Sequence, residues 1–279
     1  MKELFDKLSY NCSHKVTSMY STSFSLAVKM LSPKIQNDIY AIYGFVRFAD
    51  EIVDTFHDYD KEILLNEFET DLYNAIDRGI SLNPILNSFQ EVVNKHKIDA
   101  DLIDHFMKSM RADLYKHEYE SIQEYEDYIY GSADVVGLMC LKVFVQGDQD
   151  QFNKLKEPAM KLGSAFQKVN FLRDLKDDTE NLHRSYFPHI EGGIIDGVAK
   201  EKIIAEIDKD FEDAYTGILQ LPIEAKFGVY TAYIYYRKLL RKLTATKASE
   251  IREKRIRISN PMKMFLLTKS FVNYKLNLL

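Results

Sequence analysis

The sequence has 279 residues, of which 46% are hydrophobic and 28% charged, an ordinary balance for a globular protein with a sizeable core. Its formal net charge of −5 lacks the basic excess typical of nucleic-acid binders, so no nucleic-acid partner is expected. The first 20 residues carry charges throughout, and no uncharged apolar run of about 18 residues occurs, so we predict neither a signal peptide nor a membrane span. Two cysteines, Cys12 and Cys140, show no metal-type or disulfide-framework spacing, which favours a cytoplasmic location.

Long helices are expected along the whole chain. Glycine (11) and proline (6) are few, and apolar residues recur at three- and four-residue intervals. Helical spacing covers residues 2–30, interrupted by the polar cluster at 20–24, and Ser32 with Pro33 predicts the start of a helix that runs through Phe56. Further helices are expected at 61–78, 84–95, 99–117, from 121 to 145, 151–181, 199–220 and 224–243, then a basic stretch at 252–257 and a closing amphipathic segment to 279. Without repeats, linkers or a strand series, this predicts one all-α domain, 1–279, of roughly ten helices, with a flexible loop at Gly192-Gly193.

An oxygen-rich stripe stands out in the predicted helix at 151–181. Asn170, Asp174 and Asp178 are spaced four residues apart, which keeps their side chains on one helix face. Carboxylate and amide oxygens are ligands that Mg²⁺ prefers. Gln167 extends the stripe by one turn, and Arg173 lies beside it.

A second acidic pair, Asp50 and Asp54, has the same spacing in the predicted helix that starts at Pro33. Acids one turn apart are common on solvated helix faces, but here they lie among apolar residues, where an unpaired carboxylate is costly. Arg47, one turn earlier, could pair with Asp50 or grip a phosphate. If the two stripes face each other, Mg²⁺ and basic side chains could stabilise a departing diphosphate. The 18 Tyr and 17 Phe could line an apolar cavity for the resulting carbocation.

Small residues interrupt the apolar segment at 121–145. Gly131, Ser132, Ala133 and Gly137 would allow either close helix packing or room for a ligand at that level.

These motifs resemble the squalene/phytoene synthase family over nearly the whole chain. Asp50–Asp54 corresponds to the family's first acidic motif, and Gln167–Asp178 to its second, Q-x-x-N-x-x-R-D-x-x-x-D. Further landmarks are Ser21, Ser23 and Phe24 (with Tyr20 where the family often has His), Tyr43 and Arg47, Tyr130 with the small residues after it, Arg184 with Tyr186-Phe187-Pro188, the late Tyr236, and Arg255, whose register against Arg252 and Arg257 stays open.

The resemblance implies an isoprenoid-synthase helical bundle around a central cavity. It implies two or three Mg²⁺ ions, with Mn²⁺ as an alternative, held by Asp50, Asp54, Asn170, Asp174 and Asp178. The four aspartates with Tyr130 and Arg173 form the implied catalytic set. Substrate binding falls to Ser21, Ser23, Phe24, Tyr43, Arg47, Gln167, Asn170, Tyr236 and Arg255.

The reaction implied is head-to-head (1′-1) condensation of two prenyl diphosphates through a cyclopropylcarbinyl diphosphate. We favour phytoene formation from two geranylgeranyl diphosphates in carotenoid biosynthesis, via prephytoene diphosphate and without NADPH. The alternative is a squalene or dehydrosqualene synthase that condenses two farnesyl diphosphates. A terpene cyclase would not be expected to carry the segments at 21–24 and 130–137, and a non-catalytic helical interaction protein would not need an intact set of acids.

The closing segment, 262–279, mixes Lys263, Lys269 and Lys275 with aromatic and aliphatic residues. Such a helix can lie on an anionic membrane, which would make the protein membrane-associated, or pack on the core. The sequence leaves both readings open, and it does not predict an oligomeric state.

Overall fold

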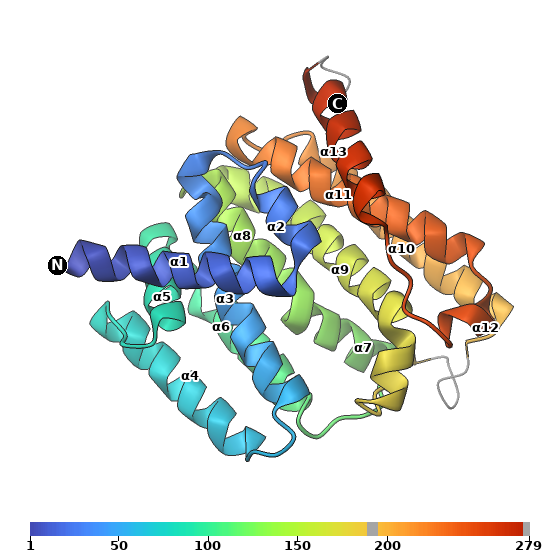
Figure 1. The fold of residues 1–279 in the computed structure, drawn as a ribbon, viewed down its shortest axis with the longest axis horizontal. Helices are drawn as coiled ribbons and strands as arrows, with labels where there is room; N and C mark the ends of the chain where they lie inside the picture. Colours follow the sequence, from blue (N-terminus) through green and yellow to red (C-terminus); the bar gives the residue numbers. More distant parts are fainter. Residues whose placement is uncertain (189–194, 276–279) are drawn as a thin grey trace.

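The structure is a computed structural model that describes residues 1–188 and 195–275, and within these ranges it contains no β-strand. The elements are α1 (Lys2–Tyr20), α2 (Thr22–Val28), α3 (Pro33–Thr55), α4 (Lys61–Arg78), α5 (Pro84–His96), α6 (Ala100–Ala112), α7 (Ile122–Ile129), the π-helical turn η1 (Tyr130–Asp134), α8 (Val135–Val145), α9 (Gln149–Glu180), α10 (Gly197–Ile218), α11 (Ile223–Ala245), α12 (Ala248–Ile251) and α13 (Asn260–Lys275) (Figure 1). The all-α prediction is confirmed. The predicted loop at Gly192-Gly193 and the last four residues lie outside the described ranges.

Local caps explain most of the helix starts. Ser21 caps α2 by accepting a hydrogen bond from the Phe24 amide at 3.3 Å, which produces the expected break after α1. Pro33 occupies the first turn of α3, as predicted. The helix expected at 99–117 is too long, because α6 ends at Ala112 and the chain then extends to an isolated bridge between Glu118 and Ser185.

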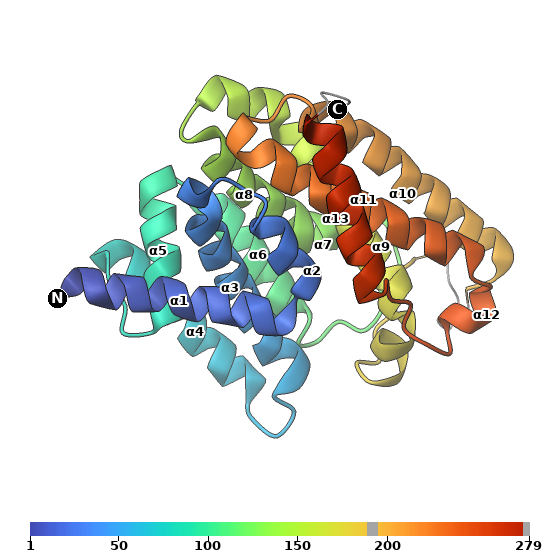
Figure 2. The same ribbon diagram turned by 45° about the horizontal axis from the view of Figure 1, so that its top comes forward.

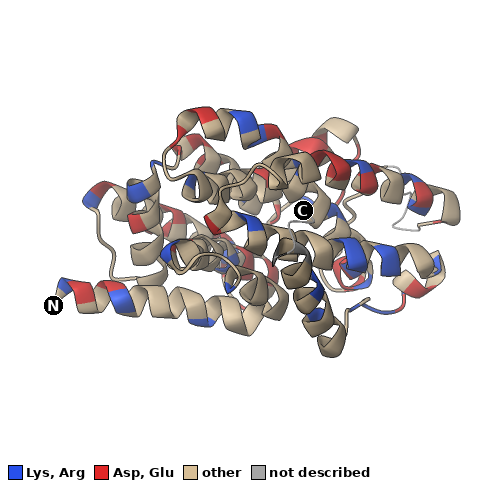
Figure 3. Cartoon of the chain, turned by 90° about the horizontal axis from the view of Figure 1, so that it is seen from above, with Lys and Arg blue, Asp and Glu red and all other residues tan. Residues whose placement is uncertain are grey.

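Two hydrophobic cores lie side by side. The first involves α2 to α6 and α8, and includes Phe45 stacked on Phe89 with ring centroids 4.0 Å apart. The second is built on α7 and α9 to α12, and includes Phe171 stacked on Tyr186, also at 4.0 Å. Figure 2 shows α9 running between the N-terminal helices and the α10–α11 pair. Figure 3 shows charges of both signs spread over the helices.

One stretch of the described chain, Ile122–Val145, is long and apolar enough to cross a membrane by length and composition, with a mean hydropathy of 1.5. The stretch is not an uncharged run, because it contains Glu124, Glu126, Asp127, Asp134 and Lys142. Within the most apolar 18 residues of this stretch, 61% is buried inside the protein, where η1 and α8 pack against α6 and α9. Mostly buried core helices of soluble proteins meet the same criterion of length and composition.

The π-helical turn η1 lies very close to α6. A Cβ atom added at Gly131 would lie 2.0 Å from Ser109 Oγ and 2.7 Å from the His105 carbonyl oxygen. The small residues of this segment therefore serve both of the predicted purposes, close helix packing and room for a ligand. Gly131 permits close helix packing, while Ser132, Ala133 and Gly137 line a cavity.

Gly131→Ala should lower the free energy of unfolding by about 1–3 kcal/mol, because the added methyl group overlaps a backbone carbonyl that cannot rotate away. Denaturant unfolding would measure the loss. The matched control is Gly197→Ala at the start of α10, where a Cβ atom meets nothing within 4 Å. Equal unfolding midpoints for the two variants would contradict the close packing at η1.

Asp134, at the end of η1, is a buried carboxylate whose pKa is raised to about 7 by burial, although Ser164 donates a hydrogen bond to it at 2.8 Å. Because the folded state keeps this proton after the unfolded chain has lost it, stability falls as pH rises from about 4 to about 7. Asp134→Asn keeps the acceptor without the charge. It should therefore stabilise the protein at pH 8 by a few kcal/mol, at about 1.4 kcal/mol per pKa unit, and lose that gain near pH 4. Urea unfolding across this range measures it, and a gain independent of pH would contradict the explanation.

Candidate active site

A largely apolar cavity of about 310 Å³ lies between the two cores. Its walls come from α2, α3, η1, α8, α9, α10 and α11. Along α9 the lining residues run from Asn170 back to Leu155, a length of about 22 Å at 1.5 Å per residue. Gly163 and Ala159 lie on that wall, where small side chains leave space for a ligand. The cavity can therefore hold a long apolar chain.

The two acidic stripes meet beyond the end of this cavity that Asn170 lines, and their four aspartates lie outside the lining itself. Asp50 and Asp54 lie in the last turns of α3, and Asn170, Asp174 and Asp178 follow one face of α9. Burial, with the negative charges of Asp174 and Asp54, raises the pKa of Asp178 to about 8. Burial and Asp54 raise the pKa of Asp50 to about 7. Charges on α3 therefore act on α9, and the stripes converge as the sequence suggested.

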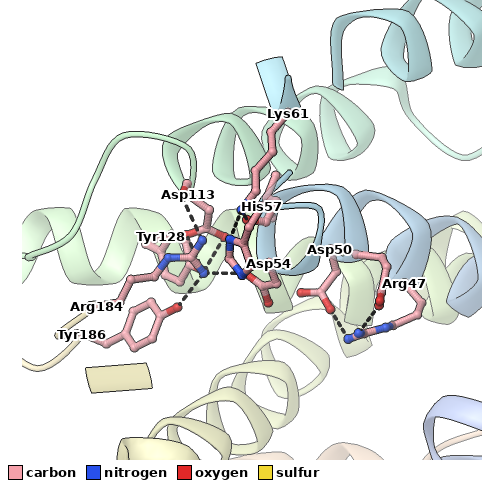
Figure 4. A network of polar contacts seen from close by, with 11 residues as sticks. Arg47, Asp50, Asp54, His57, Lys61, Asp113, Tyr128, Arg184 and Tyr186 are labelled. Carbon is pink, nitrogen blue, oxygen red and sulfur yellow. Dashed lines mark hydrogen bonds and ion pairs between the residues drawn. The ribbon is translucent and has the colours of Figure 1, made fainter. Parts of the chain in front are cut away.

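Arginines neutralise three of these four carboxylates. Arg47 pairs with Asp50 (Figure 4) and with Glu51, and its guanidinium lies 4.4 Å from the centroid of the Tyr20 ring. Asp174 accepts hydrogen bonds from Arg173 (2.9 Å) and pairs with Arg255 (2.7 Å).

Arg255, rather than Arg252 or Arg257, is thus the late arginine that contacts the second acidic motif. Within the described part of the chain, Asp178 is the aspartate of this group with no ion pair.

Arg184 pairs with the remaining aspartate, Asp54, at 2.7 Å (Figure 4). It was noted as a family landmark but not predicted as a site residue. The side chain is only 5% exposed and also donates to the Asp113 carbonyl (2.9 Å) and to the Tyr186 hydroxyl (3.4 Å). Tyr128 donates to the Asp113 carboxylate at 2.9 Å, while burial raises the pKa of Asp113 to about 7. Arg184 therefore ties α3 to the segments that follow α6 and α9.

Tyr130 does not occupy the position expected of it. Its ring meets His105 of α6 edge-on at 5.0 Å, and it does not belong to the cavity lining. Tyr128, two residues earlier, is the tyrosine of this segment that connects to the acidic end, through Asp113. The reason is that α7 passes into a π-helical turn at Tyr130, which changes the direction of the side chains relative to a continuous α-helix.

Five other predicted residues line the cavity: Phe24, Tyr43, Gln167, Asn170 and Tyr236. Phe24 stacks on Tyr43 (4.8 Å), and the Tyr236 hydroxyl donates to Asn170 Oδ1 at 3.3 Å. Ser21 and Ser23 are half-buried at the start of α2 and lie outside the lining.

The donor set at the acidic end fits Mg²⁺. All candidate ligands are carboxylate or amide oxygens, and among the described residues Asp178 makes no ion pair, although the charges of Arg184 and Arg173 act on it. Within the described ranges, no three His, Cys, Asp or Glu side chains form a ready cation site. Mg²⁺ usually binds through one or two carboxylates together with phosphate oxygens, so such a closed protein cage is not required.

A helical bundle that encloses an apolar cavity with two acidic helix faces at one end has the architecture of an isoprenoid synthase. The family description "Squalene/phytoene synthase" matches residues 17–191, so the chain belongs to this family, whose members are prenyltransferases. The chain is 26% identical to phytoene synthase 1, chloroplastic, of Solanum lycopersicum, over 92% of its own length and 66% of that protein. It is 27% identical to the 15-cis-phytoene synthase of Synechocystis, over 92% of this chain and 83% of that one.

Solved structures share the fold. A dehydrosqualene synthase in complex with ligand superposes with a TM-score of 0.80 at 19% identity, covering 97% of this chain and 98% of that one. The squalene synthase HpnC from Alicyclobacillus acidocaldarius gives 0.74 at 18% identity, covering 87% and 96%. These similarities establish the all-α fold for this chain.

Proposed function

We propose that this protein is a phytoene synthase, which joins two geranylgeranyl diphosphates head to head and releases diphosphate. The observation that carries the proposal is the cavity, about 22 Å long along α9, with the converging acids at its end. Its two curated relatives described above are named phytoene synthases.

In this proposal, the acidic end binds the diphosphate groups. Asp50, Asp54, Asn170, Asp174 and Asp178 would hold Mg²⁺, which neutralises charge on the diphosphate and so favours departure of the leaving group. In the structure, the arginines of the site are paired with these carboxylates. Cations that take over the carboxylates would leave the guanidinium groups available to hydrogen-bond phosphate oxygens.

The apolar walls would protect the carbocation left after diphosphate departs. Aromatic faces stabilise cations, and two stacked pairs lie at the acidic end of the cavity: Phe24 on Tyr43, and Phe166 on Tyr236 at 4.0 Å. Burial raises the pKa of Tyr43 to about 12, so its hydroxyl stays neutral. Gln167 adds an amide to the lining beside Asn170 and could orient the reacting chain.

Product analysis tests the proposal. The purified protein is incubated with Mg²⁺ and either the C15 or the C20 diphosphate, with and without NADPH, and the hydrocarbon is identified by mass spectrometry. A C40 product formed without NADPH is the expected result. A C30 product alone would overturn the assignment in favour of a squalene or dehydrosqualene synthase, and no hydrocarbon from either substrate would overturn the condensing activity itself.

A further inference from the structure

A second pocket lies on the side of α11 that faces away from the active-site cavity. Val229, Ala232 and Tyr236 of α11 face the cavity, whereas other residues of the helix line a separate hollow of about 290 Å³ shared with α10 and α13. We call this hollow the α11–α13 pocket. Figure 2 shows α13 lying across α11. The proposed condensation uses none of its residues.

The α11–α13 pocket is strongly basic. Arg237, Lys238 and Arg241 of α11 and Lys269 of α13 line it. Arg237 pairs with Asp208, but within the described ranges no carboxylate pairs with the other three cations. Glu212 is a further acid close enough to act on Tyr233 of the pocket. Arg241 and Lys269 are exposed and Lys238 is half-buried, so these cations are accessible to an anionic ligand that enters from solvent.

A buried hydroxyl in the same pocket also lacks a partner. Ser270 is only 1% exposed, and its Oγ atom has no hydrogen-bond partner among the described residues. An orphaned buried hydroxyl costs about 1–3 kcal/mol. Tyr230 and Tyr233, both buried, line the pocket too. Cations and hydroxyl donors around one hollow are the groups that bind the oxygens of a phosphate.

The surroundings of the pocket indicate where the phosphate comes from. On α13, Met264 (56%) and Phe265 (60%) are exposed, as are Phe271 and Val272, next to Lys269 in the helix. Exposed apolar side chains beside a cation are groups that contribute to binding at an anionic membrane surface. Lys263 donates to Thr22 at 3.0 Å, so α13 also borders α2, which forms part of the active-site cavity wall.

We propose that the α11–α13 pocket binds a phosphate group, supplied by an anionic phospholipid on which α13 rests. The cations and the Ser270 hydroxyl bind the headgroup phosphate, while the apolar residues of α13 enter the lipid layer. Docking in this way would hold the cavity next to a membrane. The pocket would therefore give the chain a lipid-binding site separate from its active site.

Vesicle flotation and phosphate titration test this inference with the intact chain. In the first arm, the protein is floated with vesicles of phosphatidylcholine that do or do not contain phosphatidic acid. In the second arm, the protein is titrated with inorganic phosphate in the absence of Mg²⁺, and binding is measured by calorimetry. The test variant is Lys238→Gln/Arg241→Gln. The matched control is Lys7→Gln/Lys108→Gln, which removes two exposed lysines of α1 and α6 that form no ion pair with any described residue.

The pocket variant should lose at least tenfold in partition to the anionic vesicles, and the control less than twofold. Ser270→Ala removes one hydroxyl and should weaken binding about tenfold, as expected for a hydrogen bond to a charged group. Circular dichroism and urea unfolding show that the variants are folded.

Inorganic phosphate binding that depends on the pocket, without vesicle binding, would support the phosphate site and identify a soluble source. Equal vesicle binding by the test and control variants, with no pocket-dependent phosphate binding, would overturn the proposal. None of these measurements depends on the product of the condensation, so they can fail independently of the proposed function.

Discussion

Asp178→Asn is expected to reduce hydrocarbon formation by on the order of 10²–10³-fold, the usual loss when one group that stabilises developing charge is removed. Asp178 is the aspartate of the site without an arginine partner among the described residues, so it is the carboxylate most available to a cation. Turnover at saturating substrate over a Mg²⁺ titration measures the effect. The variant should also need more Mg²⁺ for half-maximal rate.

Loss of folding can be separated from loss of catalysis in this experiment. Burial and two neighbouring aspartates raise the pKa of Asp178 to about 8, so the folded state binds its proton more tightly than the unfolded chain does. Ionisation therefore lowers stability as pH rises from about 4 to about 8, and the neutral asparagine should be as stable as the parent or more so above pH 8.

Asp177→Asn is the matched control, since it removes the same charge one residue away and points to another side of α9. Its turnover should stay within about twofold of the parent, because a surface change of this kind has little effect beyond screening. If the Asp178 and Asp177 variants turn over equally, the metal-site proposal for α9 is wrong.

The sequence predicted the parts of the site that local spacing controls. Four-residue steps place Asp174 and Asp178 on one face wherever the chain is α-helical, and Ser32 with Pro33 signals the start of α3. Gln167 and Asn170, predicted to bind substrate, line the cavity because they lie on the same face of a single continuous helix.

Contacts between segments far apart in the sequence could not be predicted from local residue spacing. Arg184 reaches Asp54, 130 residues earlier, from the extended chain after α9, where the Ser185 amide donates to the His117 carbonyl. Neither a periodicity nor a motif specifies such a reach. Tyr130 illustrates a second limit, because a π-helical turn changes side-chain directions in a stretch that the sequence presents as a regular helix.

Arg184→Met should produce the largest loss of stability among these variants, about 3–5 kcal/mol, because it leaves Asp113 buried without its counter-charge. The loss should grow with pH. The pKa of Asp113 is already raised to about 7, and without the guanidinium it rises further, so the folded variant binds an extra proton over a wider range. Urea unfolding at pH 6 and pH 8 measures both effects. Arg111→Met, at a partly exposed ion pair with Glu69, should cost no more than about 1 kcal/mol.

A double-mutant cycle then separates the two tasks of Arg184. Adding Asp113→Asn removes the uncompensated charge and keeps an acceptor for the Tyr128 hydroxyl, so it should restore about 1–3 kcal/mol of the lost stability. Turnover should not return, because Asp54 still lacks the arginine that pairs with it at 2.7 Å. A double variant no more stable than Arg184→Met would show that Asp113 is not what the arginine neutralises. Recovered turnover would show that Arg184 serves the fold alone and that Asp54 acts without it.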